Sequence, residues 1–174
     1  MKTHRLNLKP LTQEAFAPFG DVIQTQGHHP EEINCGQTRK YAGLARLDVA
    51  DEEGTATVHI YRSRPIRLPF RVEVMEYHPL SSQAFIPLHR RPFLVIVAPA
   101  AEILPFKSIQ GFFTNGEQGV NLNKGVWHHN QLSLLEICDY LVIERDGPGV
   151  NTIEQHLEKA LFIQAFMQQL PKEF

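Results

Sequence analysis

The stretch Phe70-Arg-Val-Glu-Val-Met-Glu-Tyr-His78 has the alternation of a half-buried β-strand, because Phe70, Val72 and Val74 fall on one face. By the same alternation, Glu76 and His78 point the same way, into the protein interior. A buried carboxylate and a buried imidazole are costly unless they are paired, bound to a metal or used in chemistry. The alternative is that the strand ends at residue 76, which leaves both groups in solvent.

Short runs on both sides of this stretch predict further strands. Thr55 to Arg62 alternates Val58 and Ile60 with polar residues, and Phe93 to Ala98 is apolar on both faces. Prolines separate the runs, at places where no ladder N–H is needed. They are Pro65, Pro69, Pro79, Pro87, Pro92, Pro99 and Pro105. Strands this short and this closely spaced predict a mainly β fold, either a sandwich or a small barrel.

A helix is predicted at each end of the strand region. Thr12 caps a short N-terminal helix. Thr152 and Gln155 fit a capping box, which predicts a C-terminal helix that ends at Pro171. Its apolar stripe would consist of Ile153, Leu157 and Leu161. We find no repeat and no linker, so residues 1–174 are predicted to form a single domain.

The composition excludes several classes of protein. Seventeen basic and nineteen acidic residues give a net charge of -2, which argues against a nucleic-acid binder that relies on positive charge. The longest apolar run, Phe93 to Ala98, is far shorter than the ~20 residues that span a membrane. The first residues are too polar for a secretory signal, so we expect a cytoplasmic protein. Cys35 and Cys138 make neither a disulfide framework nor a zinc cluster.

Two further groups of residues are candidates for ligand contacts. Gln83 and Phe85 share a face, and an amide beside an aromatic ring suits a small polar ligand, although such a pair is also common on ordinary strands. In Val126-Trp-His-His129, at most one imidazole shares a given face. We therefore predict His128 in the site and keep His129 as the weaker candidate.

Two arginines are candidates for binding an anion. Arg39 follows a predicted loop, and Arg145 ends a predicted strand before a Gly-Pro-Gly turn. Arginine binds carboxylates in a bidentate manner, through two parallel hydrogen bonds. Since most arginines are simply solvated, spacing alone supports neither residue.

Taken together, several blocks of the chain resemble the ureidoglycolate lyase family of cupin-like proteins. In order, they are Phe19-Gly-Asp-Val22, Ile33-Asn-Cys-Gly36, Arg39 to Ala45, Leu68 to Leu88, Arg91 to Ala98, Thr114 to Asn121, Gly125 to His129 and Tyr140 to Gly149. The resemblance extends from Phe19 to Asn151. It implies a cupin-like β-barrel or jelly roll, a homodimer, and an enzyme of allantoin breakdown that splits (S)-ureidoglycolate into glyoxylate and urea.

The resemblance also focuses the choice of site residues. The reaction needs a base for the hydroxyl proton, an acid for the departing nitrogen and groups that hold the carboxylate of the anionic substrate. We expect His78 or His128 to be the base, with Glu76 as the partner of either. The expected substrate contacts are Gln83, Asn121 and Arg145, with Phe85 and Trp127 as the apolar wall.

A metal ion is a separate question. Cupins commonly bind a divalent ion through two closely spaced histidines, a glutamate and a distant histidine. This chain offers Glu76, His78 and His128 but lacks the closely spaced pair of histidines. The family is associated with nickel, so a divalent metal, and nickel in particular, is a candidate cofactor.

The chain departs from the family pattern at three places. Tyr77 replaces an arginine, Asn130 replaces a proline and Glu144 replaces an aspartate. Strand parity places Tyr77 opposite Glu76 and His78, away from the site. Two alternative functions stay open: a metal-dependent cupin oxygenase or isomerase, and a non-enzymatic cupin that binds a small molecule.

Overall fold

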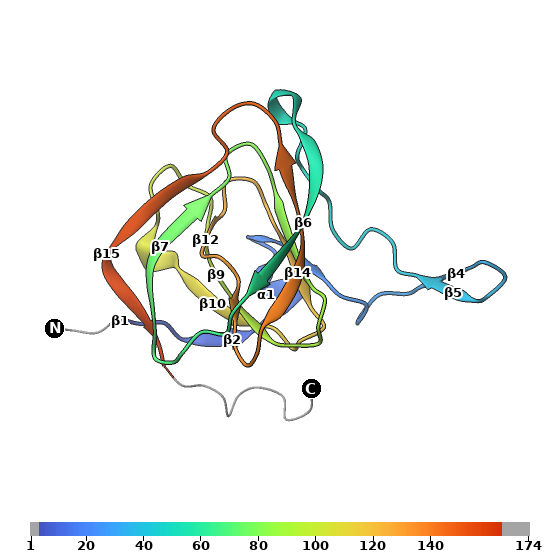
Figure 1. Cartoon of the computed structure of the whole chain (residues 1–174), viewed down its shortest axis with the longest axis horizontal. Coiled ribbons are helices and arrows are strands. Elements are labelled where there is room, and N and C mark those ends of the chain that lie inside the picture. Colours follow the sequence, from blue (N-terminus) through green and yellow to red (C-terminus); the bar gives the residue numbers. More distant parts are fainter. Residues whose placement is uncertain (1–3, 165–174) are drawn as a thin grey trace.

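The computed structural model describes residues 4–164, and Figure 1 shows its strands curving around a common interior. One sheet has eight strands, in the order β1 (His4–Arg5), β15 (Ile153–Ile163), β7 (Phe70–Tyr77), β12 (Trp127–His128), β9 (Phe93–Ala98), β10 (Gln110–Phe113) and β2 (Leu8–Pro10), with β13 (Leu132–Ser133) also paired to β9. The other sheet has the order β3 (Gly20–Ile23), β11 (Gly119–Leu122), β8 (Gln83–Pro87), β14 (Cys138–Asp146) and β6 (Thr55–Ser63). The prediction of a mainly β fold is confirmed.

Short elements connect and extend these sheets. The predicted N-terminal helix is α1 (Gln13–Phe16), and the hydroxyl of Thr12 caps it by accepting a hydrogen bond from the N–H of Ala15 at 3.2 Å. Two 3-10 turns are η1 (Asp51–Glu53) and η2 (Phe106–Ser108). A separate hairpin of β4 (Glu31–Ile33) and β5 (Thr38–Lys40) projects from the body (Figure 1).

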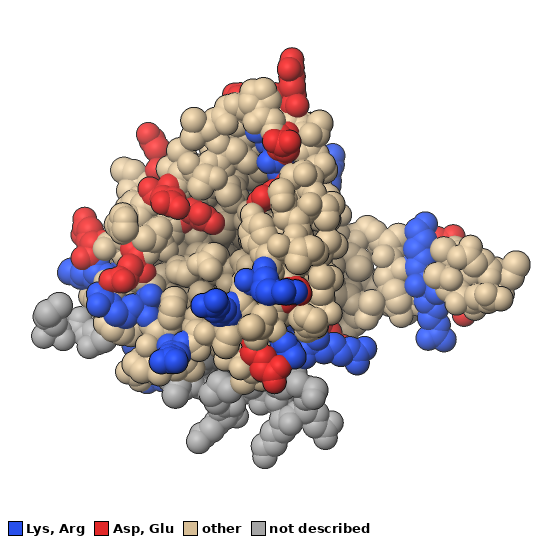
Figure 2. Space-filling view, in the orientation of Figure 1, with Lys and Arg blue, Asp and Glu red and all other residues tan. Residues whose placement is uncertain are grey.

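The charged side chains show no continuous basic surface on the face drawn in Figure 2. Lys and Arg lie there in separate groups among Asp and Glu, and the projecting hairpin carries both signs. This distribution agrees with the net charge of -2. Among residues 4–164, no helix is long and apolar enough to cross a membrane.

The main core lies between the two sheets, and a second apolar cluster lies on the opposite face of β9. Phe93, Val95 and Val97 pack with apolar residues of the five-stranded sheet, including Phe85 and Val142. The intervening residues of β9 belong to a second cluster, which is built from β7, β12, β13 and β15; they are Leu94, Ile96 and Ala98. The two-sided apolar sequence of this strand is therefore buried on both faces.

Strand β7 changes the face that it presents partway along its length. Val72 and Met75 are both fully buried in the second cluster, although they are three residues apart. The register with β15 shifts at the same place, between His156 and Leu161. The expected single face from Phe70 to His78 is therefore interrupted by an irregularity in the ladder, although Glu76 and His78 still share a face.

The predicted C-terminal helix is wrong for the residues that the structure describes. The segment Ile153–Ile163 is strand β15, which runs antiparallel to β7 and pairs Ile153 with Tyr77. The residues of the supposed capping box have other contacts, since Gln155 accepts a hydrogen bond from the Leu104 N–H at 3.3 Å. Because this strand satisfies the backbone groups along the otherwise open edge of β7, pairing overrides the helical spacing. Pro171 lies outside the described residues.

Strand β6 is oriented opposite to what its apolar residues suggest. Val58 and Ile60 are 62% and 56% exposed, whereas the intervening His59 is less exposed. Since β6 ends the five-stranded sheet, its outer face and its open edge both meet solvent in the single chain. The polar residues of β6 consequently face inward.

Candidate active site

Glu76 and His128 are brought together by the pairing of β7 with β12. They are direct partners in the ladder, and His128 is also opposite Val97 on β9. Because Val97 lies in the core between the sheets, the side chains of Glu76 and His128 face that interior. Trp127 alternates to the other face, where it packs against Tyr77 with ring centroids 4.5 Å apart.

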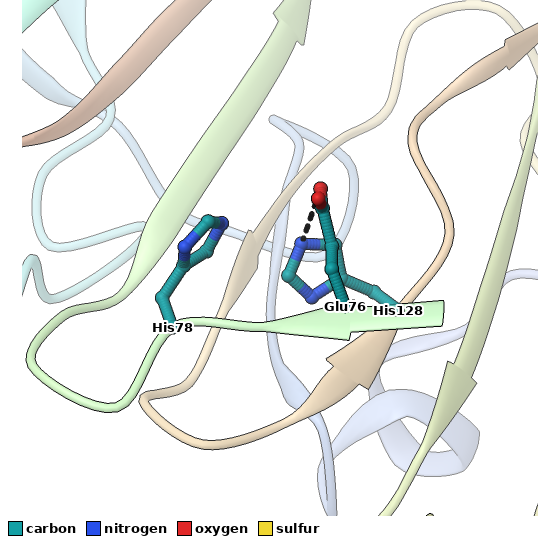
Figure 3. Close-up of side chains that lie close together, drawn as sticks. All are labelled: Glu76, His78 and His128. Atoms are coloured by element: carbon teal, nitrogen blue, oxygen red, sulfur yellow. Dashed lines mark ion pairs between the residues drawn. The ribbon is translucent and has the colours of Figure 1, made fainter. Parts of the chain in front are cut away.

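His78 follows β7 directly and completes the cluster shown in Figure 3. Its ring centroid lies 5.1 Å from that of His128, and it is only 8% exposed. The interior orientation of Glu76 and His78 is therefore the one observed, and the strand does not fray at residue 76.

Both histidines are held by backbone carbonyls through their Nδ1 atoms. His78 Nδ1 lies 2.5 Å from the Asn151 carbonyl oxygen, and His128 Nδ1 lies 2.9 Å from that of Val126. A carbonyl oxygen only accepts, so each Nδ1 carries a proton and each neutral ring has its lone pair on Nε2. Both Nε2 atoms are buried and have no hydrogen-bond partner. Such orphaned atoms are costly to bury, by roughly 1–3 kcal/mol each, so a ligand that donates to them or binds their lone pairs would be favoured here.

The charges in the cluster influence one another. The contact with His128 lowers the pKa of the Glu76 carboxyl, against the opposing effect of burial. The two atoms involved, Glu76 Oε1 and His128 Nε2, are 3.6 Å apart (Figure 3). Burial, followed by the charge of His128, lowers the pKa of the His78 imidazole. The cluster therefore pairs an ionised carboxylate with one histidine and keeps the other neutral near pH 7.

Glu76 and His78 line a cavity of about 670 Å³ between the sheets, and His128 contacts Glu76 without being among the lining residues. Gln83 and Phe85 of β8 line it too, as predicted from their shared face. Further lining residues come from β6, β14 and the segments after β12 and β14; among them are Tyr61, Asn130, Gln131, Glu144, Asn151 and Thr152. This volume is in the range of small-molecule sites, which bury most of the ligand surface.

A second carboxylate, Glu144, stands in the same cavity. It accepts a hydrogen bond from Gln83 Nε2 at 2.6 Å and from the Tyr61 hydroxyl at 3.0 Å. His59 Nε2 lies 3.3 Å from the same carboxylate. Burial and the negative charge of Glu144 raise the pKa of Tyr61 to about 12, so its hydroxyl stays a donor near neutrality.

The remaining predicted contacts are placed differently. Arg145 lines the cavity, but its guanidinium donates three hydrogen bonds to backbone carbonyls, those of Asp51, Glu52 and Pro148. Asn121 is fully buried beside Asp21, to whose carboxylate it donates at 3.1 Å, and it is not among the residues that line the cavity. Trp127 packs in the second cluster and donates from Nε1 to the Ala101 carbonyl at 2.9 Å.

Of the other residues singled out by sequence, one lines the cavity and three lie elsewhere. Tyr77 lies on the Trp127 face, as strand parity predicts, whereas Asn130 lines the cavity. His129 stacks edge-on against Phe70, with ring centroids 5.8 Å apart. Arg39 is exposed on the projecting hairpin.

Sequence reasoning missed the cluster around Glu144. Its partners His59 and Tyr61 alternate with Val58 and Ile60, but alternation does not say which side of the strand faces inward. In the structure Tyr61 lines the cavity, and both Tyr61 and His59 contact Glu144. The alternation of ionisable and apolar residues over residues 58–61 was the available signal.

The donor set of the first cluster also suits a divalent cation. Ligand atoms of His78, His128 and Glu76 all lie within 4.8 Å of one another. Both Nε2 nitrogens present a lone pair, and the Nδ1–H bonds to carbonyls are the support that metal-bound histidines usually have. Nitrogen and oxygen donors of this kind fit nickel, iron, manganese or zinc.

Comparison with known proteins gives a consistent result. The family model described as ureidoglycolate lyase matches residues 3–164. A ureidoglycolate lyase of Burkholderia mallei is 50% identical over 163 residues, which cover 94% of each chain. One of Pseudomonas paraeruginosa is 46% identical, covering 87% of this chain and 89% of the relative. One of Pseudomonas syringae is 42% identical, covering 90% and 92%.

Among solved structures, a dTDP sugar isomerase of Desulfovibrio desulfuricans aligns with 14% identity and a TM-score of 0.45. The alignment covers 82% of this chain and 87% of the isomerase.

Proposed function

The chain belongs to the ureidoglycolate lyase family, and we propose that Glu76, His78 and His128 form its catalytic centre. It is a ureidoglycolate lyase, an enzyme of purine breakdown that splits ureidoglycolate into glyoxylate and urea. The observation that carries the proposed centre is the pair of buried, unpartnered Nε2 atoms beside an ionised carboxylate in a cavity of substrate size.

The proton transfers follow from how each imidazole is held. His78 is neutral with its lone pair on Nε2, so we assign it as the base that takes the hydroxyl proton. As that proton leaves, the O–H electrons form the C=O bond of glyoxylate, and the C–N electrons move to the departing ureido nitrogen.

His128 supplies the second proton. A proton on its Nε2 turns the contact with Glu76 Oε1, 3.6 Å away, into an ion pair. From that form His128 protonates the departing nitrogen and releases urea, and Glu76 remains ionised throughout. One proton is taken up by His78 and one is given up by His128. Proton exchange with solvent then returns both histidines to their starting protonation states.

A metal ion, where bound, would be held by the same three side chains and would polarise the oxygens of the substrate as a Lewis acid. An ion on both Nε2 atoms would withdraw their lone pairs from proton transfer. The metal content of the active protein therefore distinguishes the two roles of these histidines.

The finer features of the enzyme are also proposals. The substrate is the (S) enantiomer, the fold is a cupin-like barrel, and residues 1–174 act as one domain. Support for the barrel comes from the two curved sheets (Figure 1), both of which contribute residues to the lining of the cavity. The exposed thiol of Cys35 is free, which suits the reducing conditions of the cytoplasm.

We also propose that the enzyme works as a homodimer. The support is the outer face of β6, where Val58 and Ile60 are exposed beside an unpaired strand edge. Burying both features against a second copy removes apolar surface from water and covers the edge.

The experiment that tests the function is an assay of urea and glyoxylate released from racemic ureidoglycolate. We expect equal amounts of the two products, and consumption of half of the substrate if one enantiomer is used. The two alternatives, a metal-dependent cupin of another class and a non-enzymatic binding protein, both predict no urea. Folded protein without product would overturn the proposed centre and the activity together.

A further inference from the structure

Gln83 is held in one direction by a carboxylate. It is 4% exposed on β8, and its side-chain Nε2 lies 2.6 Å from Glu144 Oε2 on the neighbouring strand β14. A carboxylate oxygen only accepts hydrogen bonds, so the group that Gln83 turns toward Glu144 is its NH₂. The carbonyl oxygen Oε1 of Gln83 must then point away from Glu144.

That carbonyl oxygen is buried and accepts no hydrogen bond, and its side chain lies near His78, whose pKa it raises. Gln83 lines the catalytic cavity together with His78, so the free acceptor belongs to the cavity where the substrate binds. A buried carbonyl without a donor is costly, and a ligand that brings an N–H removes the penalty.

Glu144 is itself prevented from turning. The Tyr61 hydroxyl donates to its Oε1 at 3.0 Å, and His59 Nε2 lies 3.3 Å from the same atom, so Oε2 is left for Gln83. An amide alone is ambivalent, because it can present either its donor or its acceptor to a ligand. Beside a fixed carboxylate the NH₂ of Gln83 is turned to Glu144, and Oε1 is the atom of the amide that is left without a hydrogen bond.

We infer that Gln83 Oε1 accepts an N–H of the substrate's ureido group, and that Glu144 is a positioning residue that makes Gln83 select this end of the molecule. This inference rests on the proposed function. The two products differ in the required property: urea carries N–H donors, whereas glyoxylate in the aldehyde form that the reaction releases has only acceptors. A site built to accept a substrate N–H discriminates strongly against a group that lacks one.

Urea and glyoxylate correspond to the two halves of the substrate, so inhibition by each product probes one half of the site. In Glu144→Gln the neighbour of Gln83 is an amide that presents either a donor or an acceptor, so the direction of Gln83 is no longer enforced. We expect the inhibition constant of urea and the KM to rise about tenfold, the change made by a hydrogen bond of ordinary strength. The inhibition constant of glyoxylate should stay within about twofold and kcat should fall less than KM rises.

Other variants test the role against a general loss of structure. Glu144→Asp keeps the carboxylate and should recover part of the affinity for urea. Gln83→Met removes the acceptor at similar volume and should reproduce the selective loss of urea. The matched control is Glu73→Gln, because Glu73 is exposed on β7 and forms an ion pair with the equally exposed Arg71, and this change should leave both inhibition constants unaltered.

Each outcome decides the inference. Selective weakening of urea in Glu144→Gln and in Gln83→Met supports it. Equal weakening of urea and glyoxylate, or no change in either, overturns it, provided that circular dichroism shows the variants folded. If the wild-type protein releases no urea from ureidoglycolate, the proposed function has failed, and calorimetric binding of urea to wild type and variants still tests the role of Gln83 separately.

Discussion

Oε1 of Glu76 lies 3.6 Å from Nε2 of His128, and the two residues are direct partners in the ladder between β7 and β12. The contact joins positions that are 52 residues apart by number, and it exists because β12 is inserted between β7 and β9. The carboxylate and the imidazole share the face toward the interior between the sheets, where Glu76 lines the cavity. The chemistry of this pair, with His78 beside it, is the basis for the first prediction.

Replacing either histidine of the centre should slow the chemical step. We expect His78→Asn and His128→Asn each to lower kcat by at least ~100-fold, since each removes one proton transfer. The measurement is steady-state release of urea and glyoxylate. His129→Asn is the control, because His129 packs on Phe70 and should keep kcat within a few-fold of wild type. Near-normal turnover in both centre variants would falsify the assignment.

Metal content should show how the two Nε2 atoms are used. Elemental analysis of the purified enzyme, with activity measured before and after chelation, separates two outcomes. A stoichiometric ion that is lost with the activity, and restored by nickel or another divalent ion, identifies Glu76, His78 and His128 as ligands. Full activity in metal-free protein supports direct proton transfer by the histidines.

Trp127 should matter for stability rather than for turnover. Its indole packs in the second cluster and donates to the Ala101 carbonyl at 2.9 Å, on the face opposite the cavity. Trp127→Phe should lower the free energy of unfolding by about 1–3 kcal/mol, through lost packing and a lost hydrogen bond. Urea is a product, so guanidinium denaturation is the suitable measurement. A large loss of kcat in folded Trp127→Phe would place the indole at the substrate after all.

Strand β15 should contribute strongly to the stability of the eight-stranded sheet. Leu161 is 6% exposed in the second cluster, so Leu161→Ala should destabilise the protein by roughly 2–5 kcal/mol. Glu158 of the same strand is exposed, and Glu158→Ala should change stability by less than about 0.5 kcal/mol. Equal effects of the two changes would contradict the packing of β15 against β7.

The oligomeric state should depend on the outer face of β6. Light scattering at micromolar concentration should give about twice the chain mass of 19.9 kDa. Ile60→Lys places a charge among the exposed apolar residues and should shift the protein toward the monomer. Ile103→Lys changes another exposed isoleucine, away from β6, and should not have this effect. A monomeric wild-type protein would refute the homodimer.

Local sequence determined those features that depend on neighbours along one strand. Alternation placed Glu76 and His78 on one face, set Tyr77 against them, and separated Trp127 from His128, because side chains of a strand alternate in any β-sheet. The two-sided burial of Phe93–Ala98 and the cap by Thr12 likewise follow from residues that are close together in sequence. Alternation and the family resemblance are therefore enough to select Glu76, His78 and His128 as the candidate centre.

Tertiary structure decided what each strand faces and what satisfies its edges. Ile153–Ile163 has helical spacing, yet it forms a strand because the backbone of β7 needs a partner. His59 and Tyr61 turn inward and leave the apolar side of β6 exposed, an orientation that a pattern of alternation cannot choose by itself. The contact between Gln83 and Glu144 likewise depends on strands β8 and β14 lying side by side, across 61 positions of sequence. Local periodicity is a property of one strand, whereas orientation, edge pairing and the carboxylate that directs Gln83 arise only when separate strands are packed together.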